Sequence, residues 1–456
     1  MNASSVYDLI VCGAGPSGVC AALSAARLGL QVLLIDQNGF PGGMNTAALV
    51  GPLMTFHSGS TQIAKGIAQE IVDELAKRGG TLGHIPDPIG MVPTITPVDA
   101  ELLKLVYFDL LRRESNITLL LRSVITGVTA DSVTVHGKGG MKTFCARRII
   151  DATGDGDAAA LMGVPFKEGR ESDGFAQPMT LMFTVENVDR TQVIDYIRSR
   201  PDQFVMDHSC SIDDYIAVSG FFELVQQAQE KGELTFPRDR VLFFEGVQKG
   251  TVTVNMTRVT LLKGTRAEDL SVAESETHRQ LDEALAFFRK YLPGFESCRL
   301  KSVAALTGVR ESRRIQGIKT LTQQDIWENR AQEDSIGICA YPIDIHDPTG
   351  KTLVWDAERG DCCYDIPYGI LVPENQDYLL AAGRCVSATH EALASVRISV
   401  ACMVMGQAAG TAAYLSIQKN VPFKDVPVNE LQQLLHEQGA IPGKKWLEKQ
   451  GEENDS

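Results

Sequence analysis

The chain has no excess of positive charge. Its 456 residues include 43 Lys and Arg against 57 Asp and Glu, which gives a formal net charge of −14 at pH 7. Affinity for a nucleic-acid backbone needs clustered cations, so we expect no nucleic-acid partner. The hydrophobic content of 44% and the charged content of 22% are ordinary for a soluble globular protein. The length is enough for about two or three domains.

The sequence also lacks a C-x-x-C pair. Its ten cysteines are scattered, and only Cys362 and Cys363 are adjacent. We therefore expect neither a zinc ribbon nor a C-x-x-C redox disulfide. Inert thiols in a reducing cytosol are the simpler interpretation, and redox chemistry at Cys362-Cys363 stays open as an alternative. The acidic run 151–157 could form a calcium-binding turn, but Met162 stands where the EF-hand pattern requires glutamate, so no metal site is expected.

A signal peptide and a membrane span are also not expected. The N-terminus has no basic region, and its first apolar run belongs to a predicted strand, so we expect a cytoplasmic protein. The most apolar stretch, 398–417, has the length of a bilayer span. It contains Gly406, Gln407 and Gly410, and we interpret it as a buried helix of the main domain.

The stretch from Val6 to Gly43 carries the strongest pattern in the chain. An apolar strand (7–12) is followed by a glycine turn, an alanine-rich helix to Arg27 and a second strand (32–35) that ends at Asp36. This is a βαβ unit with a G-x-G-x-x-G turn in its expected context. The residues of that turn are Gly13, Gly15, Pro16, Ser17 and Gly18.

Each part of this unit has a physical role. Gly13 permits the tight turn, Gly15 lets backbone amides reach a diphosphate, and Gly18 lets the helix pack against the strand. The helix N-terminus then faces the diphosphate with unpaired N–H groups. Asp36 would accept hydrogen bonds from an adenosine ribose, and its charge disfavours a 2′-phosphate. The pattern predicts dinucleotide binding.

Further along the chain the regular alternation of strands and helices ends. Helices are predicted over 62–77, capped by Ser60-Thr61, and from Thr96-Pro97 to Leu110. A strand (117–121) and a hairpin (133–136 and 142–150) follow, and a helix is predicted over 275–291. We predict an α/β fold: a Rossmann-like cofactor domain with a parallel sheet, built from residues 1–165 and 365–440. An inserted α+β substrate or cap domain comprises 166–364, and 441–456 form a tail.

A glycine pair follows Asp36, an Ala-Thr-Gly segment follows the hairpin, and an Ala-Ala-Gly-Arg segment precedes the apolar helix. These three segments resemble those of the FAD-dependent oxidoreductases of the glutathione-reductase-like superfamily, which is distantly related to fumarate-reductase-type flavoproteins. A closer likeness to a bacterial group within this family lies in 308–315, 341–347 and 383–390. That group implies a cofactor and a fold but no substrate.

The resemblance implies FAD as cofactor and a role for each segment. Gly42, Gly43 and Met44 would lie along the flavin side, and the backbone of Val124 would meet the adenine edge. Thr153, Gly154 and Asp155 would lie beside the adenosine part, and Gly383 and Arg384 near the ribityl chain. The helix from Ser395 to Ser416, with Ser395 as its N-cap, would point its positive end at the N1/C2=O edge of the ring.

Four side chains are candidates for catalysis beside the flavin. His390 lies between the third segment and the apolar helix, so we predict an acid or base near N5 or N1. Arg310 could bind a carboxylate or another anion, although structural ion pairs are an equal alternative. His57 could tether FAD covalently, as in some relatives, but the motif around that tether is absent. His346 is either a polarised base or part of a surface turn.

These features predict an enzyme that transfers a hydride between flavin N5 and a small organic substrate, with an unidentified electron acceptor or donor. No second G-x-G-x-x-G opens a helix, so a separate NAD(P)H domain is not expected. One alternative is a non-catalytic binding protein on a flavoprotein fold. Another is an NAD-linked dehydrogenase, which would leave Gly42-Gly43 and Thr153-Gly154 unexplained. The oligomeric state stays open.

Overall fold

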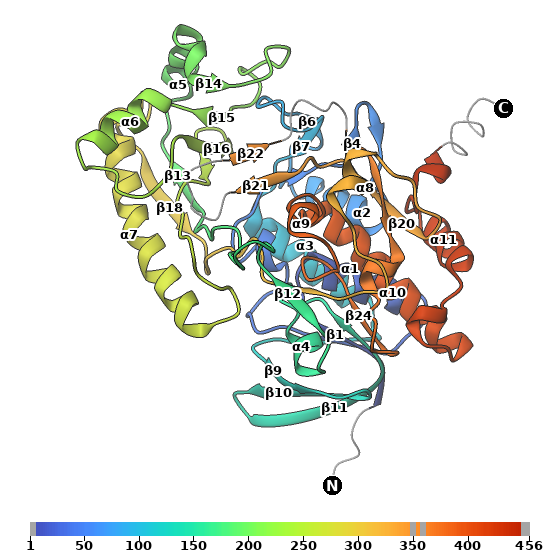
Figure 1. The fold of residues 1–456 in the computed structure, drawn as a ribbon. Coiled ribbons are helices and arrows are strands. Elements are labelled where there is room, and N and C mark those ends of the chain that lie inside the picture. Colours follow the sequence, from blue (N-terminus) through green and yellow to red (C-terminus); the bar gives the residue numbers. More distant parts are fainter. Residues whose placement is uncertain (1–5, 347–352, 356–361, 448–456) are drawn as a thin grey trace, which may run out of the picture.

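A seven-stranded sheet forms the centre of the protein, shown in Figure 1 as a computed structural model that describes residues 6–346, 353–355 and 362–447. The strand order is β8-β2-β1-β11-β10-β9, and β24 also pairs with β11. β8, β2, β1, β11 and β24 are joined by parallel pairing, whereas β9, β10 and β11 form an antiparallel meander. The predicted α/β class with a parallel sheet is confirmed. The bounds are β1 (Val6–Cys12), β2 (Val32–Ile35), β8 (Ile117–Leu120), β9 (Val124–Val128), β10 (Ser132–Gly137), β11 (Gly140–Asp151) and β24 (Leu379–Ala381).

The central strands β1 and β2 are apolar on both faces, and both of these faces are covered. Leu9 and Val11 point into one core, and Ile10 and Cys12 point into the core on the opposite face. This alternation follows the two-residue period of a strand. The first core contains the helices α1 (Pro16–Arg27) and α10 (Ser399–Lys419).

α1 and α10 lie backbone to backbone. A Cβ on Gly406 would lie 2.1 Å from the carbonyl oxygen of Ser17, and one on Gly410 would lie 2.3 Å from that of Ala21. The small residues noted in the sequence are therefore required by close helix packing. α10 is long and apolar enough to cross a membrane, but 89% of its most apolar window is buried inside the protein.

Two helices beside α1 begin later than the sequence pattern suggested. α2 (Ile67–Ala76) has Gly66 at its N-cap, and residues 61–62 form the short strand β5 instead. α3 (Ala100–Arg113) is capped by Asp99, whose carboxylate accepts hydrogen bonds from the backbone amides of Glu101 (2.9 Å) and Leu102 (3.0 Å). A capping carboxylate at Asp99 satisfies two amides that Thr96-Pro97 would have left unpaired.

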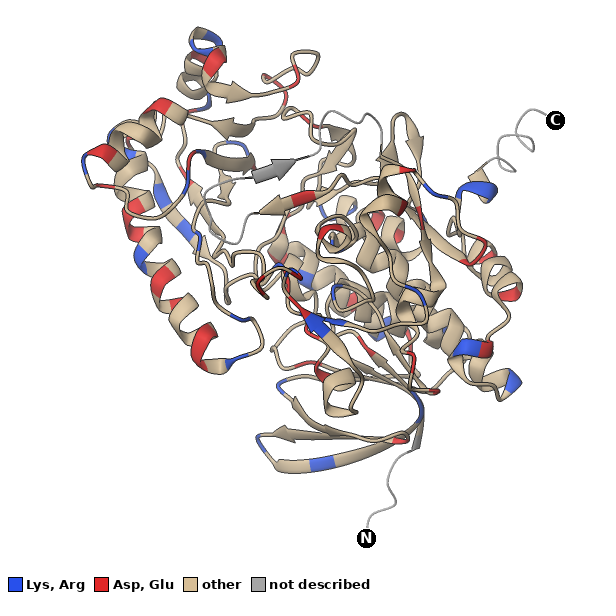
Figure 2. Ribbon diagram, in the orientation of Figure 1, with Lys and Arg blue, Asp and Glu red and all other residues tan. Residues whose placement is uncertain are grey.

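A second, antiparallel sheet of six strands lies beside the first, in the order β14-β15-β16-β17-β13-β18. The helix α7 flanks it, and charges of both signs follow each other along α7 (Figures 1 and 2). Its apolar side packs into a separate core with the sheet. The elements are β13 (Phe183–Glu186), α5 (Arg190–Ser199), β14 (Phe204–Val205), β15 (Ala217–Gly220), α6 (Phe222–Glu230), β16 (Val241–Glu245), β17 (Val252–Val254), α7 (Ala267–Tyr291) and β18 (Arg299–Val303).

The core of this second layer spans less of the chain than the predicted insertion of 166–364. Its buried apolar residues lie between Leu181 and Ala304. Leu321, Ile336 and Tyr364 pack instead into the core of the first layer. The chain thus returns to the first layer well before residue 364, because β20 (Ser335–Cys339) packs against α10 and β23 (Tyr364–Pro367) pairs with β20.

The remaining elements connect these layers. The predicted tail is described only as far as residue 447, and its last part lies outside the described residues. The short elements are η1 (Gly43–Asn45), β3 (Leu53–Met54), β4 (His57–Ser58), β5 (Thr61–Gln62), β6 (Ile85–Pro86), β7 (Thr94–Thr96), α4 (Asp157–Leu161), β12 (Phe166–Glu168), η2 (Pro201–Gln203), β19 (Arg313–Ile315), α8 (Gln323–Trp327), β20 (Ser335–Cys339), β21 (Asp344–His346), β22 (Leu353–Trp355), β23 (Tyr364–Pro367), η4 (Tyr368–Leu371), α9 (His390–Val396), η5 (Phe423–Asp425) and α11 (Val428–Glu437).

Candidate functional site

A cavity of about 710 Å³ lies between the two layers. Its walls come from the carboxyl ends of β1, β2, β11 and β24 on one side and from β15 and β16 on the other. Crevices at the carboxyl ends of parallel strands are the usual ligand sites of such folds. The expected site residues that line the cavity are Gly13, Gly15, Pro16, Ser17, Asp36, Gly43, Met44, Val124, Thr153, Gly154, Asp155, Arg310, His346, Gly383 and Arg384.

Three segments far apart in sequence meet at one edge of this cavity. The amide of Ala152 donates to the carbonyl of Cys12 (2.7 Å), and the amide of Ala382 donates to that of Asp151 (2.8 Å). A Cβ on Gly13 would lie 2.4 Å from the oxygen of Ala152. The turn after β1 therefore touches the segment after β11, and the segment after β24 is bonded to the same strand.

The glycine turn after β1 has one open side. A Cβ on Gly18 would lie 1.8 Å from the oxygen of Gly13, so this glycine is needed for packing and does not line the cavity. A Cβ on Gly15 would have no protein atom within 4 Å, because this position faces the cavity. The hydroxyl of Ser17, at the first turn of α1, is buried and has no hydrogen-bond partner among the described residues. An open backbone beside an unsatisfied hydroxyl is suited to an oxygen-rich ligand group such as a diphosphate.

Asp36 lies at the end of β2 and is buried to 7% exposure. Its Oδ2 accepts a hydrogen bond from the amide of Ala14 (2.6 Å) and its Oδ1 one from the amide of Asn38 (2.7 Å). Burial raises the pKa of Asp36, and these two amides lower it. Each carboxylate oxygen keeps a further lone pair for a ligand hydroxyl. Val124 lines the same end of the cavity.

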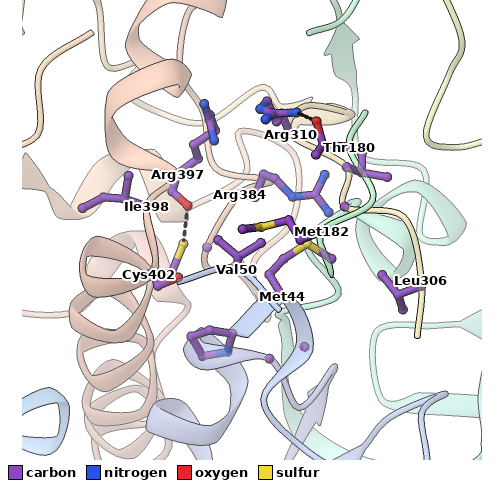
Figure 3. Close-up of a pocket in the computed structure, with 18 of the residues that line it drawn as sticks. Met44, Val50, Thr180, Met182, Leu306, Arg310, Arg384, Arg397, Ile398 and Cys402 are labelled. Carbon is purple, nitrogen blue, oxygen red and sulfur yellow. Dashed lines mark hydrogen bonds between the residues drawn. The ribbon is translucent and has the colours of Figure 1, made fainter. Parts of the chain in front are cut away.

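The second glycine pair supports the first turn from outside. The amide of Gly42 donates to the carbonyl of Ala14 (2.7 Å), and Gly42 itself does not line the cavity. A Cβ on Gly43 would lie 2.9 Å from the Cα of Gly15. Gly43 and Met44 line the cavity, and Figure 3 shows Met44 close to Val50 and Met182.

Arg384 and Gly154 complete this edge. Arg384 Nη2 forms an ion pair with Asp155 (2.8 Å), and its Nη1 donates to the hydroxyl of Ser312 (3.1 Å). A Cβ on Gly154, which has a φ of +82°, would lie 2.9 Å from Arg384 Nη2. The guanidinium of Arg384 therefore ties the segment after β24 to the segment after β11.

The expected helix from Ser395 to Ser416 is broken in two, which corrects the role of Ser395. α9 ends at Val396, and α10 starts at Ser399 with Ile398 at its N-cap. Ser395 is buried within α9, where its hydroxyl donates to the carbonyl of Tyr341 (2.5 Å), so it does not cap α10. The first turn of α10 lines the cavity through Ile398, Ser399 and Cys402, and Figure 3 shows Ile398 and Cys402 at this position.

His390 does not line the cavity, which differs from its expected position. It is the first residue of α9, and its Nδ1 forms an ion-pair contact with Glu311 Oε2 (2.8 Å). Glu311 also pairs with Arg314. The far end of α9, at Arg397, faces the cavity, and a helical rise of 1.5 Å per residue separates the two ends by roughly 10 Å. The break before α10 therefore moves His390 away from the cavity.

His57 also lies outside the cavity, in β4. Its Nδ1 is hydrogen-bonded to Thr94 Oγ1 (3.0 Å), and its ring packs edge-on against His84 with centroids 5.1 Å apart. Burial lowers the pKa of His57. These contacts fit a neutral structural histidine better than a covalent tether.

His346 lines the cavity with both ring nitrogens occupied. Arg258 Nη2 lies 2.9 Å from His346 Nδ1, and Asp344 Oδ2 lies 3.2 Å from its Nε2. A guanidinium only donates, so Nδ1 accepts and Nε2–H donates to the carboxylate. Burial lowers the pKa of His346 well below its usual range. This arrangement indicates that His346 orients Asp344 and does not act as a base. Asp347, the other expected neighbour of His346, lies outside the described residues.

Arg238, Arg397, Tyr341 and Asp344 also line this end of the cavity, and the sequence patterns had not singled them out as a site. One signal was available: the run Pro237-Arg238-Asp239-Arg240 offers one carboxylate to two guanidinium groups. Arg240 pairs with Asp239 (2.7 Å) and leaves Arg238 without that partner.

No group of three or more His, Cys, Asp or Glu that could hold a metal ion occurs within 6–346, 353–355 and 362–447. Cys362 and Cys363 are free thiols. Burial raises the pKa of Cys362 well above its usual range, which keeps the thiol protonated and unreactive.

Comparison with protein families gives a match over most of the chain. The sequence model of a family described as "FAD dependent oxidoreductase" matches residues 8–435. Dihydrolipoyl dehydrogenase of Manduca sexta is 26% identical over 171 residues, 35% of this chain and 31% of that protein. Sarcosine oxidase subunit alpha of Rhizobium meliloti (strain 1021) is 56% identical over 36 residues, which are 8% of this chain and only 4% of that protein.

Solved structures with a similar arrangement are much more distant in sequence. A geranylgeranyl bacteriochlorophyll reductase-like protein from Thermoplasma acidophilum is 13% identical, with 95% of this chain and 84% of that chain covered and a TM-score of 0.47. p-Nitrophenol 4-monooxygenase from Pseudomonas putida DLL-E4 is 12% identical, with 92% and 82% covered and a TM-score of 0.47.

Proposed function

The chain belongs to the FAD-dependent oxidoreductase family, and on that premise we propose that it binds FAD in the cavity and transfers a hydride between flavin N5 and a small organic substrate. The observation that carries the proposal is the open side of Gly15 beside the unpartnered hydroxyl of Ser17. These groups lie where the segments after β1, β11 and β24 meet at one cavity. A protein freed from nucleotide binding has no need of such an opening.

The residues present fit each part of FAD. Gly15, Ser17 and the N-terminus of α1 would hold the diphosphate through amides, a hydroxyl and the positive end of the helix dipole. Asp36 would accept the ribose hydroxyls at the end of the cavity that Val124 also lines. The remaining length of the cavity, from Met44 to the start of α10, is left for the flavin ring.

When bound, FAD supplies the hydride chemistry, and the protein's part is to position, shield and polarise. α10 has no acidic residue in its first turn and no side-chain cap, so its first amides are free to hold negative charge. Met44, Val50 and Met182 lie close together at this wall (Figure 3) and would exclude water. Arg310 and Arg397 lie beyond them, where the second layer meets the cavity.

The proposal is tested by the visible spectrum of the purified protein. We expect a yellow protein that releases FAD on denaturation and bleaches when it is reduced anaerobically. A panel of candidate organic donors, mixed anaerobically with the oxidised protein, would then identify the substrate by bleaching. A colourless protein that takes up no FAD on reconstitution would contradict the proposal.

A further inference from the structure

Four guanidinium groups gather around one buried carboxylate where the cavity meets the second layer. They belong to Arg238, Arg258, Arg310 and Arg397, and the carboxylate is that of Asp344. We call this group the arginine cluster. Arg238, Arg310, Arg397 and Asp344 all line the cavity. So many cations in a buried place are costly unless their charge is compensated.

Two members of the arginine cluster have anionic or aromatic partners. Arg397 Nη2 lies 3.8 Å from Asp344 Oδ2 and 3.5 Å from the carbonyl oxygen of Asp344. Arg258 contacts His346, which itself contacts Asp344. Burial opposes ionisation of Asp344, but its contact with His346 and the charges of Arg397 and Arg310 hold its pKa well below the usual range, so this carboxylate is ionised.

Arg310 is hydrogen-bonded only to neutral oxygens among the described residues. Its Nη1 donates to Pro178 O (2.7 Å) and Thr180 Oγ1 (2.6 Å), and its Nη2 donates to Asn255 Oδ1 (3.2 Å). These bonds fix the guanidinium in place, and Figure 3 shows its contact with Thr180. They supply no negative charge, and Arg310 shares the charge of Asp344 with the other members of the cluster.

Arg238 is the least satisfied group of the cluster. It is 3% exposed and lines the cavity, yet its guanidinium forms no hydrogen bond or ion pair with any residue of the described chain. Burial and the neighbouring Arg258 lower the pKa of Arg238 to about 9, and burial with Arg397 lowers that of Arg310 to about 9. Both are still charged at neutral pH. The cavity therefore has a surplus of positive charge at this end.

We propose that the substrate is a carboxylic acid, whose carboxylate is held by the guanidinium groups of Arg238 and Arg310. This inference rests on the proposed function, because it assigns the substrate of the same site. A guanidinium fork matches a carboxylate in geometry and charge. Asp344 lines the cavity with an Oδ1 that has no partner in the described chain, and it would repel a dianion more than a single negative charge. A carboxylate thus fits better than a phosphate.

The test uses the FAD-loaded protein and simple anions. Propionate, lactate, inorganic phosphate and the neutral analogue propionamide are titrated separately, and binding is followed by the visible spectrum of the flavin and by the melting temperature. We expect the two carboxylates to perturb the spectrum and raise the melting temperature, and propionamide to do neither. Tighter binding of phosphate than of either carboxylate would overturn the assignment, and so would equal binding of propionamide.

Variants locate the anion. Replacing a charged hydrogen-bond donor typically weakens binding by about 10- to 100-fold, which we expect for Arg238→Gln. Arg238→Lys should recover part of this loss because it restores the charge without the fork. Arg240→Gln is the matched control. Arg240 lines the same cavity, but its guanidinium already pairs with Asp239, so we expect less than about a threefold change.

The stability of Arg238→Gln separates binding from structure. A guanidinium without a protein partner contributes nothing to folding, so the variant without added anion should melt at the same or a higher temperature than the wild type. A clear fall in melting temperature would show a structural role and overturn the inference. Failure of the proposed function looks different: the protein would retain no FAD, while carboxylates would still raise the melting temperature of the colourless protein if the arginine cluster binds them.

Discussion

Gly15→Ala should separate FAD binding from folding. The new Cβ would meet no protein atom within 4 Å, and Gly15 has an ordinary extended backbone with φ of −70°. Loss of an N-cap glycine lowers the free energy of unfolding, whereas the reduced conformational freedom of the unfolded chain raises it. The free energy of unfolding without FAD should therefore change by about 1 kcal/mol or less. The protein should therefore fold normally.

The same methyl group would occupy the open side of the turn, where we place the diphosphate. Each backbone amide that loses its bond to a charged oxygen costs about 1.5–3 kcal/mol, so losing one weakens FAD binding by about 10- to 100-fold. A larger loss is expected if the diphosphate shifts away from both the turn and Ser17. The measurement is a titration of apoprotein with FAD, followed by quenching of flavin fluorescence.

Two glycines serve as comparisons. Gly139 also has nothing within 4 Å of an added Cβ but lies in the turn between β10 and β11, so Gly139→Ala should bind FAD like the wild type. Gly18→Ala should fail to fold, because its Cβ would lie 1.8 Å from a backbone oxygen. If Gly15→Ala bound FAD as tightly as Gly139→Ala, the diphosphate would not lie at this turn, and our placement of the cofactor would be refuted.

Three further predictions concern residues of the first layer. Ser17→Ala removes the unpartnered hydroxyl, so FAD affinity should fall by about 3- to 10-fold with no loss of apoprotein stability; unchanged affinity would contradict a role for this hydroxyl. Gly406→Ala drives a methyl group to 2.1 Å from a backbone oxygen of α1, so urea denaturation should show a loss of about 1–3 kcal/mol, and a stabilised variant would refute the close packing. Burial raises the pKa of Asp151 from 3.8 to about 6. The folded state thus binds this proton more tightly, and the free energy of unfolding should fall by about 3 kcal/mol as pH rises from about 4 to above 6. Asp151→Asn should reduce this pH dependence of the free energy of unfolding. A pH profile identical to that of the wild type would contradict the role of Asp151.

Much of the cofactor domain could be predicted because its signals are local. The β1–turn–α1–β2 unit, the hairpin of β10 and β11 and the strand β24 each follow from periodicity and glycine positions within a short window. Helix starts were harder to predict, because the N-caps are Asp99 for α3 and Gly66 for α2, whereas the sequence pattern favoured Thr96-Pro97 and Ser60-Thr61. The core of the second layer ends at Ala304, before the end of the predicted insertion, and the short strands after residue 312 carry no sequence signal of which core they join.

At the candidate site, too, some residues could be predicted from the sequence and others could not. Placing His390 near the flavin assumed one continuous helix from Ser395, but the chain breaks at Arg397 and Ile398 and a buried contact with Glu311 holds His390 elsewhere. Arg238 was missed because the run 237–240 does not show which of its two arginines pairs with Asp239. Only its lack of a partner, visible after folding, distinguishes it from Arg240.

The sequence by itself determined that the chain would build the β1–turn–α1–β2 unit, because glycines at fixed spacing between two apolar strands permit a turn that few other residues allow. The tertiary structure decided what faces that site. Arg238, Arg310 and Arg397 come from positions far apart in the chain and meet around Asp344 only when the second layer closes over the sheet. Uncompensated charge is a property of three-dimensional neighbours, so the anion-binding end of the cavity could emerge only from the fold.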